Sequence, residues 1–419
     1  MKLDEGEQTD CPLFFGGINV YLQEKVGLFR RTPRWVDKLL DVKPLLAWSA
    51  KFQHMTRAKD LGELTVSMLQ AENGRQAKEL RRMLDWLKGQ APFDAVCLSN
   101  LLLAGMSRPL EMELGIPIIC TMQGEDTFLD DLPEAYSTAA WALLKERCAD
   151  CDAFIAVSRF YGGEMIRRLS LPQDRVHCVY NGILLDGYQP ADSPPSPPCI
   201  GYLSRMCLPK GLHLLVDAFI ELKQDAAYND VRLLLVGSCT KGDETYLKKQ
   251  KEKLQAAGVL DHVRIYPNVT REEKQQRLQE MTVLSVPACY GEAFGLYILE
   301  ALASGVPVVQ PRRGAFAELV NITGGGWIYD PNDEKGEKAT DSEDAVRVNA
   351  QAKASADSRV ESAALARCLA ESLRDEDGRR KRAEQGRLAV LERFSITAMA
   401  SAVAEVYDKA ITAHKDQNV

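Results

Sequence analysis

The stretch "GEAFGLYILEALASGVPVVQP" (residues 291–311) joins a helical pattern directly to a short apolar run. After Gly291 and Glu292, the apolar residues that follow Gly295 recur at helical spacing. The closing "PVVQ" is typical of a strand that is buried on both faces. A helix that leads into such a strand indicates a doubly wound α/β domain, and it leaves open why the acidic Glu300 stands in so apolar a helix.

The same alternation extends along the chain. We expect a first series of strands at 94–99, 116–122, 153–158 and 175–180. A second series is expected at 199–204, 231–237, 262–267, 282–288, 307–310 and 326–330. Amphipathic patterns between strands, such as 74–90 and 210–224, predict helices. Two more helices are expected at roughly 362–391 and 395–413, and a serine is expected to cap the start of the second. The fold class is therefore α/β, with parallel sheets and right-handed crossovers.

The two series are separated by "YQPADSPPSPP" (188–198), which holds five prolines in eleven residues and suits a linker. We predict two Rossmann-like domains that face an interdomain cleft. Their boundaries are 1–187 for an N-terminal acceptor-side domain, 188–198 for the linker and 199–392 for a nucleotide-sugar-binding domain. Residues 393–419 are expected to form a helix that packs back on the first domain.

Composition excludes several classes of protein. The 419 residues are 46% hydrophobic and 26% charged with a net charge of −7, which disfavours nucleic acid as a partner. No window approaches the roughly 18 consecutive apolar residues of a membrane span. The start is not a secretory signal, and eleven sparse cysteines suit reduced core residues, so we expect a cytoplasmic protein. A single C-x-x-C, Cys148 to Cys151, with five scattered histidines predicts no metal site.

The carboxylates of the opening stretch can be interpreted chemically. A helix that begins near Gly295 offers free N–H groups and a partial positive charge to an anion. Glu292 precedes this helix and Glu300 lies one to two turns inside it, so both are expected to point into the cleft. Carboxylates accept hydrogen bonds from vicinal hydroxyls, such as those of a ribose or a hexose. The alternative is that Glu300 is a solvated helix residue.

A second cluster follows the first strand of the second series. That strand is expected to end at Gly201, and Arg205 and Lys210-Gly211 come before the next helix. Two cations beside a strand-to-helix turn suit a diphosphate.

These motifs together resemble the GT-B glycosyltransferases of family 4, which are retaining and use nucleotide sugars. The family motif E-x-F-G-x-x-x-x-E occurs at 292–300, and G-x-L-S-R-x-x-x-x-K-G occurs at 201–211. "VYNGI" (179–183) and "RRGAFAELV" (312–320) resemble two further family segments, the latter through Gly314 and Glu318. The resemblance covers roughly residues 95–330.

The resemblance implies a role for each matched residue. Glu300 would bind the ribose hydroxyls, Glu292 would contact the donor sugar, and Arg205 and Lys210 would neutralise the leaving diphosphate. The other donor-binding residues would be Gly201, Phe294, Gly295, Leu296 and Glu318. The implied reaction is sugar transfer with retention, by front-face attack, without a metal or other cofactor.

Two departures from the family pattern concern the acceptor side. The chain opens without the usual first strand and glycine-rich loop, so we expect that these are missing, the alternative being that Gly16-Gly17 serves as the loop. Gln123 stands where many relatives have a histidine, and glutamine cannot transfer protons. The cleft candidates are Gln123, Gly124, Glu125, Ser158 and Asn100, and the alternative for each is a cap at a strand end.

Residues 28–40 mix arginines with Phe29 and Trp35, which suits peripheral membrane contact or, alternatively, an ordinary solvated helix. The sequence therefore predicts a glycosyltransferase that moves a sugar from a UDP-, GDP- or ADP-linked donor to an unidentified acceptor. The alternative is a nucleotide-binding GT-B protein without turnover; an epimerase of this fold is disfavoured by the E-x7-E spacing.

Overall fold

The computed structural model describes Phe14 and residues 58–90, 92–333 and 356–417. Three expectations concern residues outside these ranges: the loop at Gly16-Gly17, the missing first strand, and membrane contact at 28–40. The chain forms two compact units, which we call unit 1 and unit 2. Unit 1 comprises Met1–Ala156, Gly162–His177 and Ala404–Val419, and unit 2 comprises Val157–Tyr161 and Cys178–Val403.

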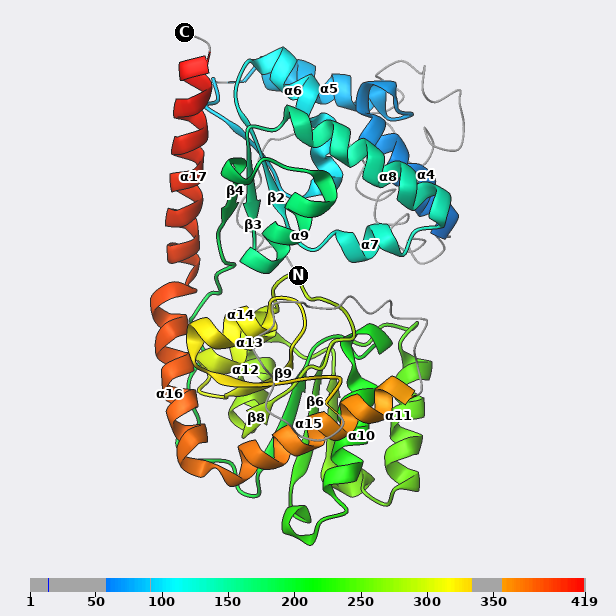
Figure 1. Ribbon diagram of the computed structural model, residues 1–419, viewed down its shortest axis with the longest axis vertical. Coiled ribbons are helices and arrows are strands. Elements are labelled where there is room, and N and C mark those ends of the chain that lie inside the picture. Colours follow the sequence, from blue (N-terminus) through cyan, green and yellow to red (C-terminus); the bar gives the residue numbers. More distant parts are fainter. Residues whose placement is uncertain (1–13, 15–57, 91, 334–355, 418–419) are drawn as a thin grey trace. The chain divides into compact units, whose positions relative to one another are not determined.

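Unit 1 is a sheet with helices packed around it, in the upper part of Figure 1. Its strands lie in the order β1-β2-β3-β4, and the first three run parallel. The strands are β1 (Val96–Leu98), β2 (Ile118–Met122), β3 (Ala153–Ala156) and β4 (Val176–Cys178). The helices are α4 (Ala58–Gln70), α5 (Ala77–Lys88), α6 (Ser107–Leu114), α7 (Asp126–Asp130), α8 (Glu134–Arg147) and α9 (Arg159–Leu169). Strand β2 is almost entirely buried, as its unbroken apolar run predicts.

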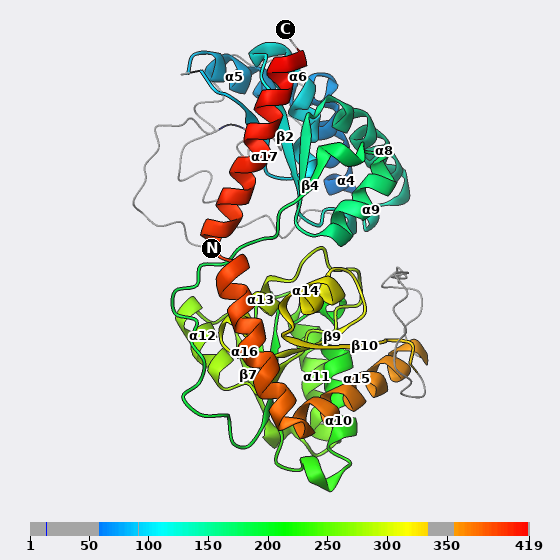
Figure 2. The same ribbon diagram turned by 60° about the vertical axis from the view of Figure 1, so that its left-hand side comes forward.

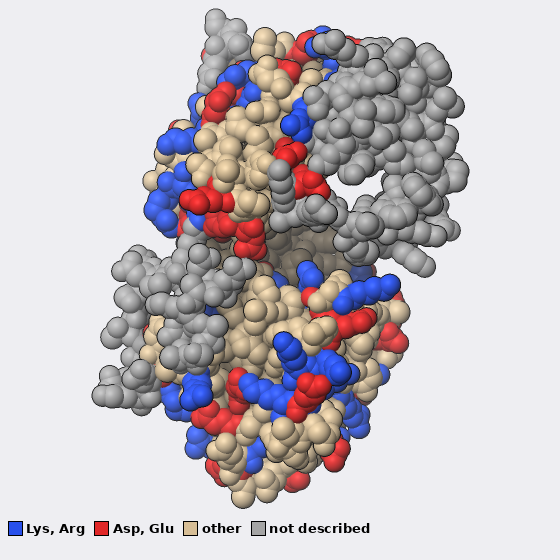
Figure 3. All heavy atoms as spheres, turned by 90° about the vertical axis from the view of Figure 1, so that its right-hand side faces the viewer, with Lys and Arg blue, Asp and Glu red and all other residues tan. Residues whose placement is uncertain are grey.

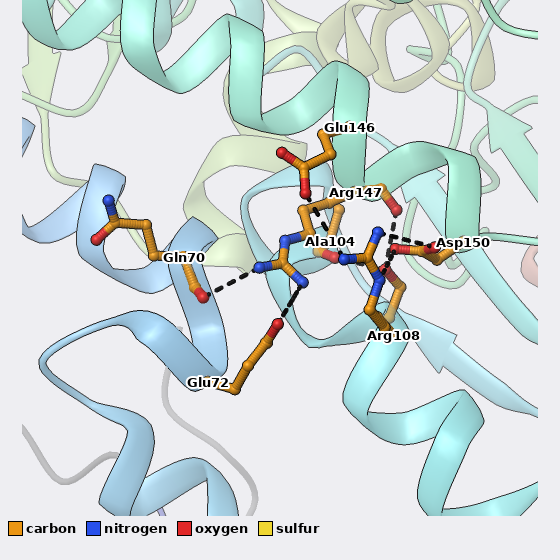
Figure 4. A network of polar contacts seen from close by, with 8 residues as sticks. Gln70, Glu72, Ala104, Arg108, Glu146, Arg147 and Asp150 are labelled. Atoms are coloured by element: carbon orange, nitrogen blue, oxygen red, sulfur yellow. Dashed lines mark hydrogen bonds and ion pairs between the residues drawn. The ribbon is translucent and has the colours of Figure 1, made fainter.

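A buried arginine joins the helices of unit 1 (Figure 4). Arg147, at the end of α8, has only 3% of its side chain exposed. Its guanidinium donates to Glu72 at 3.0 Å and to the carbonyl of Gln70 at 3.1 Å. Its own carbonyl accepts from the Ser107 hydroxyl at 2.9 Å. Gln70 ends α4 and Glu72 comes just after it, and Ser107 begins α6, so Arg147 links two segments of unit 1 to the end of α8.

Unit 2 is a larger sheet with the strand order β10-β9-β8-β5-β6-β7. Every strand pair in it is parallel. The strands are β5 (Cys199–Leu203), β6 (Arg232–Gly237), β7 (Val263–Pro267), β8 (Val283–Leu284), β9 (Val308–Pro311) and β10 (Gly326–Tyr329). Counted within the unit, the order is that of the Rossmann fold, and it reverses between β5 and β8. The loops that follow β5 and β8 therefore diverge at the carboxyl edge of the sheet.

Helices cover both faces of this sheet (Figures 1 and 2). They are α10 (Leu212–Leu222), α11 (Glu244–Ala256), α12 (Arg271–Gln279), α13 (Leu296–Ala303), α14 (Phe316–Thr323), α15 (Ala356–Arg374) and α16 (Glu376–Arg393). The last helix, α17 (Ile396–Gln417), begins in unit 2 and belongs to unit 1 from Ala404 onward. Figure 3 shows Lys and Arg interspersed with Asp and Glu on the visible face of unit 2. None of the described helices is long and apolar enough to cross a membrane.

All ten expected strands are present, but several bounds differ. The expected strand at 282–288 is only Val283–Leu284, because the chain already turns into a loop at Ser285. The expected helix at 362–391 is two helices, which meet at Asp375, where the carboxylate caps α16 by accepting from the Gly378 N–H at 2.9 Å. The serine cap of α17 is confirmed, since the Ser395 hydroxyl accepts from the Ala398 N–H at 3.1 Å.

The proline-rich segment 188–198 belongs to unit 2 and does not separate the two units. Tyr188 at its start is buried, and Pro190 lies against Gly305. The units instead divide at residues 177 and 178, and residues 157–161 also belong to unit 2. Composition predicts a stiff segment here, but stiffness does not determine which surface the segment packs on.

Candidate donor-binding site

The loops after β5 and β8 carry three of the predicted charged residues of unit 2, Arg205, Lys210 and Glu292. The two loops are joined by the Cys289 N–H, which donates to the Pro209 carbonyl at 2.8 Å. Gly211 closes the first loop with a φ of 70°, and a Cβ there would lie 1.7 Å from the Pro287 carbonyl oxygen. Only glycine fits this left-handed position against another backbone. The close approach therefore fixes the first loop against the second.

Lys210 and Glu292 form an ion pair at this edge. The Lys210 ammonium lies 2.6 Å and 2.9 Å from the two carboxylate oxygens of Glu292. The hydroxyls of Tyr290 and Tyr297 each donate to Glu292 at 3.2 Å. Burial, together with the neighbouring Glu292 charge, raises the pKa of Tyr297, so its hydroxyl remains a donor. The carboxylate is thus held at a fixed place by three donors.

Arg205 forms a bidentate ion pair with Asp243, which lies just before α11. The guanidinium Nε and Nη2 lie 2.9 Å and 3.0 Å from the carboxylate oxygens. Burial alone would raise the pKa of Asp243, but hydrogen bonds from Arg205 and Thr240 bring it below its ordinary value. The Arg205 side chain is still 52% exposed, whereas that of Asp243 is 7% exposed. Asp243 therefore orients a cation that remains accessible to a ligand.

Glu300 lies in α13 and is not a freely solvated residue. Its Oε1 accepts from the Lys274 ammonium at 2.5 Å and from the Tyr188 hydroxyl at 2.9 Å. Burial and the Glu300 charge raise the pKa of Tyr188, which keeps this hydroxyl protonated. The carboxylate side chain is 17% exposed. The apolar helix around it is explained by burial of the other face of α13 in unit 2.

The segment between the two glutamates turns sharply into α13. Gly295 has a φ of 105° and directly precedes the helix, so it takes a conformation that other residues rarely adopt. The first N–H groups of a helix lack partners within it and are directed outward. The Phe294 side chain is buried and its ring lies 6.4 Å from that of Tyr180, whereas Leu296 is exposed. The predicted contact of this segment with a donor would therefore involve its backbone.

Two residues of the predicted donor set lie elsewhere. Gly201 is inside β5, which continues to Leu203, and a Cβ on it would lie 2.1 Å from the Met281 sulfur. The expectation that the strand ends at Gly201 is wrong; the glycine leaves room for a core side chain. Glu318 accepts from the N–H groups of Arg159 and Phe160 at 2.9 Å and 3.0 Å. Its carboxylate is thus bound to the start of α9.

Unit 1 brings together four of its predicted cleft residues. Buried Glu125 accepts from the N–H groups of Leu101 at 3.1 Å, Gln123 at 2.9 Å and Gly124 at 3.0 Å. The Asn100 side chain accepts from the Leu102 N–H at 3.0 Å. Glu125 and Asn100 therefore organise the loops after β1 and β2. This agrees with the alternative interpretation, in which each of these residues caps a strand end. Gln123 is exposed at the same edge of the sheet.

Ser158 also caps a helix, because its hydroxyl accepts from the Tyr161 N–H at 3.0 Å. Cys148 and Cys151 are buried. Within the described ranges, no group of three or more His, Cys, Asp or Glu could hold a metal.

Sequence reasoning missed the partners of the predicted residues: Tyr188, Lys274, Asp243, Tyr290 and Tyr297. Tyr290 and Tyr297 stand just before and inside the 292–300 motif, so their closeness to Glu292 along the chain was an available signal. Asp243 offered another, because it stands just before a helical pattern where a capping acid is common. Tyr188 and Lys274 lie far from the motifs along the chain, and nothing in their spacing indicates their role.

Two family models match the chain. The model described as "Glycosyl transferases group 1" matches residues 189–340, and "Glycosyltransferase Family 4" matches residues 62–186. The chain is 25% identical to a D-inositol 3-phosphate glycosyltransferase of Xylanimonas cellulosilytica, over 94% of this chain and 92% of the relative. It is 31% identical to a phosphatidyl-myo-inositol mannosyltransferase of Mycobacterium leprae, over 34% of this chain and 37% of the relative.

The fold is also shared with solved structures. Anabaena Alr3699/HepE, solved in complex with UDP, superposes with a TM-score of 0.63 at 18% identity. The match covers 81% of this chain and 84% of that protein. At this level of identity the likeness is one of fold.

Proposed function

Since the chain belongs to the group 1 glycosyltransferases of family 4 and has the GT-B fold, we propose that it is a retaining enzyme that uses a nucleotide-sugar donor. The acceptor is a hydroxyl group. The sparse cysteines suit a reducing compartment, which supports a cytoplasmic reaction.

One observation carries the proposal. Glu292 and Glu300 belong to the loop and helix that follow β8, and Arg205 and Lys210 follow β5. Ligands of open α/β sheets bind at the carboxyl edge where the strand order reverses, which in unit 2 is between β5 and β8. Two cations and two carboxylates meet the needs of a diphosphate flanked by two polyhydroxylated groups.

The proposed binding mode follows from the chemistry of each group. Glu300 accepts from the ribose hydroxyls and Glu292 accepts from hydroxyls of the sugar to be transferred. Arg205 and Lys210 bind the diphosphate, together with N–H groups at the start of α13. Because Glu292 holds Lys210 and Asp243 holds Arg205, both cations are oriented before the donor arrives. Such preorganisation avoids reorganisation during the reaction.

In the proposed reaction, the acceptor oxygen bonds to the anomeric carbon on the face from which the diphosphate leaves. The glycosidic bond to the diphosphate breaks, and the acceptor proton passes to an oxygen of the leaving phosphate. Arg205 and Lys210 stabilise the charge that develops on the diphosphate, so the proposal assigns this role to no metal. Positioning and electrostatic stabilisation supply most of the rate increase.

The comparisons suggest which donors and acceptors to test first. The Anabaena neighbour has been solved with UDP, with UDP and glucose, and with UDP-glucose, so uridine donors come first. The names of two relatives refer to inositol 3-phosphate and phosphatidyl-myo-inositol. Phosphorylated and lipid-linked polyols are therefore the first acceptors to screen.

Calorimetric titration with UDP, GDP and ADP tests the donor site. One nucleotide should bind, and Glu300→Ala should weaken it about tenfold or more, because hydrogen bonds to a charged group contribute about 1.5–3 kcal/mol. Lys248→Met is a control for loss of a charged side chain elsewhere on unit 2, since Lys248 forms an exposed ion pair with Glu252 on α11. A folded wild-type protein that binds none of the three would overturn the donor site.

Binding followed by a turnover assay separates the enzyme from a binding protein. With the donor sugar conjugate, the enzyme should transfer sugar to an acceptor or slowly hydrolyse the donor. Tight nucleotide binding with neither reaction across the acceptor panel would favour a protein that binds without turnover.

A further inference from the structure

The first turn of α9 contacts the loop that carries Glu292. Residues 157–161 belong to unit 2, although the rest of α9 belongs to unit 1. Ser158 is completely buried, and its hydroxyl donates to the Ala293 carbonyl at 2.6 Å. The same hydroxyl accepts from the Tyr161 N–H at 3.0 Å. One side chain therefore caps α9 and holds the backbone next to Glu292.

Glu318 completes this cap from α14. Its two carboxylate oxygens accept separately from the Arg159 and Phe160 N–H groups. With the Ser158 bond, the first three N–H groups of α9 all have partners inside the protein. A carboxylate at the positive end of a helix is also electrostatically favourable. Glu318 thus fixes the start of α9, and with it the position of Ser158.

Two aromatic residues extend the contact to either side of Glu292. A Cβ added to Gly291 would lie 3.1 Å from the ring of Phe160, so this ring packs against Gly291. The Tyr180 hydroxyl donates to Glu318 at 2.8 Å, and its ring packs near Phe294. The residues before and after Glu292 therefore both rest on the α9 cap.

The other side of the loop is held by the segment after β9. The Ala315 N–H donates to the Glu292 carbonyl at 2.9 Å. A Cβ on Gly314 would lie 2.4 Å from the Glu292 backbone, so the two segments touch. The Glu292 backbone is therefore held on both sides. Its carboxylate, which is paired with the Lys210 ammonium, is the part of the residue that a ligand could contact.

We propose that Ser158 and Glu318 are positioning residues, which hold the loop 291–295 so that Glu292 reaches the donor sugar. The proposal rests on the donor site above and adds a separable consequence. Glu300, which is expected to bind the nucleotide, lies in α13 beyond this loop and is held by Tyr188 and Lys274. Loss of the cap should therefore reduce recognition of the sugar and spare that of the nucleotide.

The test compares the affinity for a nucleotide with that for its sugar conjugate. UDP and UDP-glucose form the first pair, and GDP and GDP-mannose form the second. For the pair that the wild type binds, Ser158→Ala should weaken the sugar conjugate ~10-fold, because it leaves a buried carbonyl without its donor. The bare nucleotide should change less than about twofold. Glu318→Gln should act in the same direction, since an amide removes the charge and one of the two acceptors.

Two further variants show whether the effect is specific. Ser158→Thr keeps the hydroxyl and should restore sugar recognition. Ser395→Ala removes a comparable serine cap from α17, and should affect neither ligand. Urea unfolding of every variant excludes misfolding as the cause.

The proposal is overturned if Ser158→Ala and Glu318→Gln bind the sugar conjugate like the wild type. It is also overturned if both ligands weaken equally, or if Ser395→Ala reproduces the effect. A wild-type protein that binds no nucleotide at all contradicts the donor site itself, and that result is distinct from a failure of the positioning role.

Discussion

Arg147 in unit 1 and Arg205 in unit 2 both pair with a carboxylate, yet their surroundings differ sharply. The Arg147 side chain is 3% exposed and bonds to Glu72 and to a backbone carbonyl (Figure 4). The Arg205 side chain is 52% exposed and bonds to Asp243. The two terminal nitrogens of the buried Arg147 guanidinium bond within the protein, although its Nε has no partner among the described residues, whereas an exposed guanidinium can still bind a ligand. The comparison shows that burial, more than pairing, separates a structural arginine from one available for binding.

The largest expected effect concerns the exposed arginine and falls on activity. Arg205→Met should lower kcat/KM ~10²–10³-fold, because it removes a cation that is proposed to stabilise the leaving diphosphate. The free energy of unfolding should also fall, by about 1–2 kcal/mol, since the buried Asp243 carboxylate keeps its bonds from Thr240 but loses those from Arg205. Donor hydrolysis or transfer rates and urea unfolding measure the two quantities.

Lys248→Met again serves as the control for loss of a cation elsewhere on unit 2. An Arg205→Met protein that keeps its activity would remove Arg205 from the proposed mechanism.

The second effect concerns the buried arginine and falls on stability. Arg147→Met should lower the free energy of unfolding by about 1.5–3 kcal/mol, because it removes the hydrogen bonds of a buried guanidinium to Glu72 and to the Gln70 carbonyl. Arg167→Met is the matched control in the same unit, since Arg167 is 70% exposed beside Glu164 and should cost less than about 0.5 kcal/mol. Urea unfolding gives both values.

Nucleotide affinity of Arg147→Met should stay at the wild-type value, because its contacts all lie in unit 1. Equal stability losses in Arg147→Met and Arg167→Met would show that burial does not distinguish these two arginines.

The smallest effect is the pH dependence of the Arg205–Asp243 pair. The folded-state pKa of Asp243 is lowered, so its stabilising contribution is present above its ordinary value of 3.8 and is lost as pH falls through the folded value. The difference in unfolding free energy between the wild type and Asp243→Asn should be about 1–2 kcal/mol, because the charge is removed from a buried group that accepts several hydrogen bonds. It should stay constant between about pH 7 and pH 5 and shrink below about pH 4.

Urea unfolding at a series of pH values measures this difference. A difference that varies between neutral pH and about pH 5 would contradict the lowered pKa.

Much of unit 2 was predictable because its motifs combine local signals. The apolar runs gave the strands, and Gly295 gave the turn into α13. The roles of Gly201 and Glu318 were not predictable, because a motif match does not show what lies beside a residue. Met281 fills the space at Gly201, and the start of α9 binds Glu318. Both neighbours are far away along the chain.

The sequence by itself determined the α/β class, the ten strands, the family motifs and the residues with suitable chemistry. These follow from hydrophobic periodicity and from short-range spacing, which act within a few residues. Only the tertiary structure decided the strand order that reverses between β5 and β8, and the partners Asp243, Lys274 and Tyr188. Such pairings join segments that are distant along the chain, and they depend on which surfaces can be buried together, a property that no local pattern encodes.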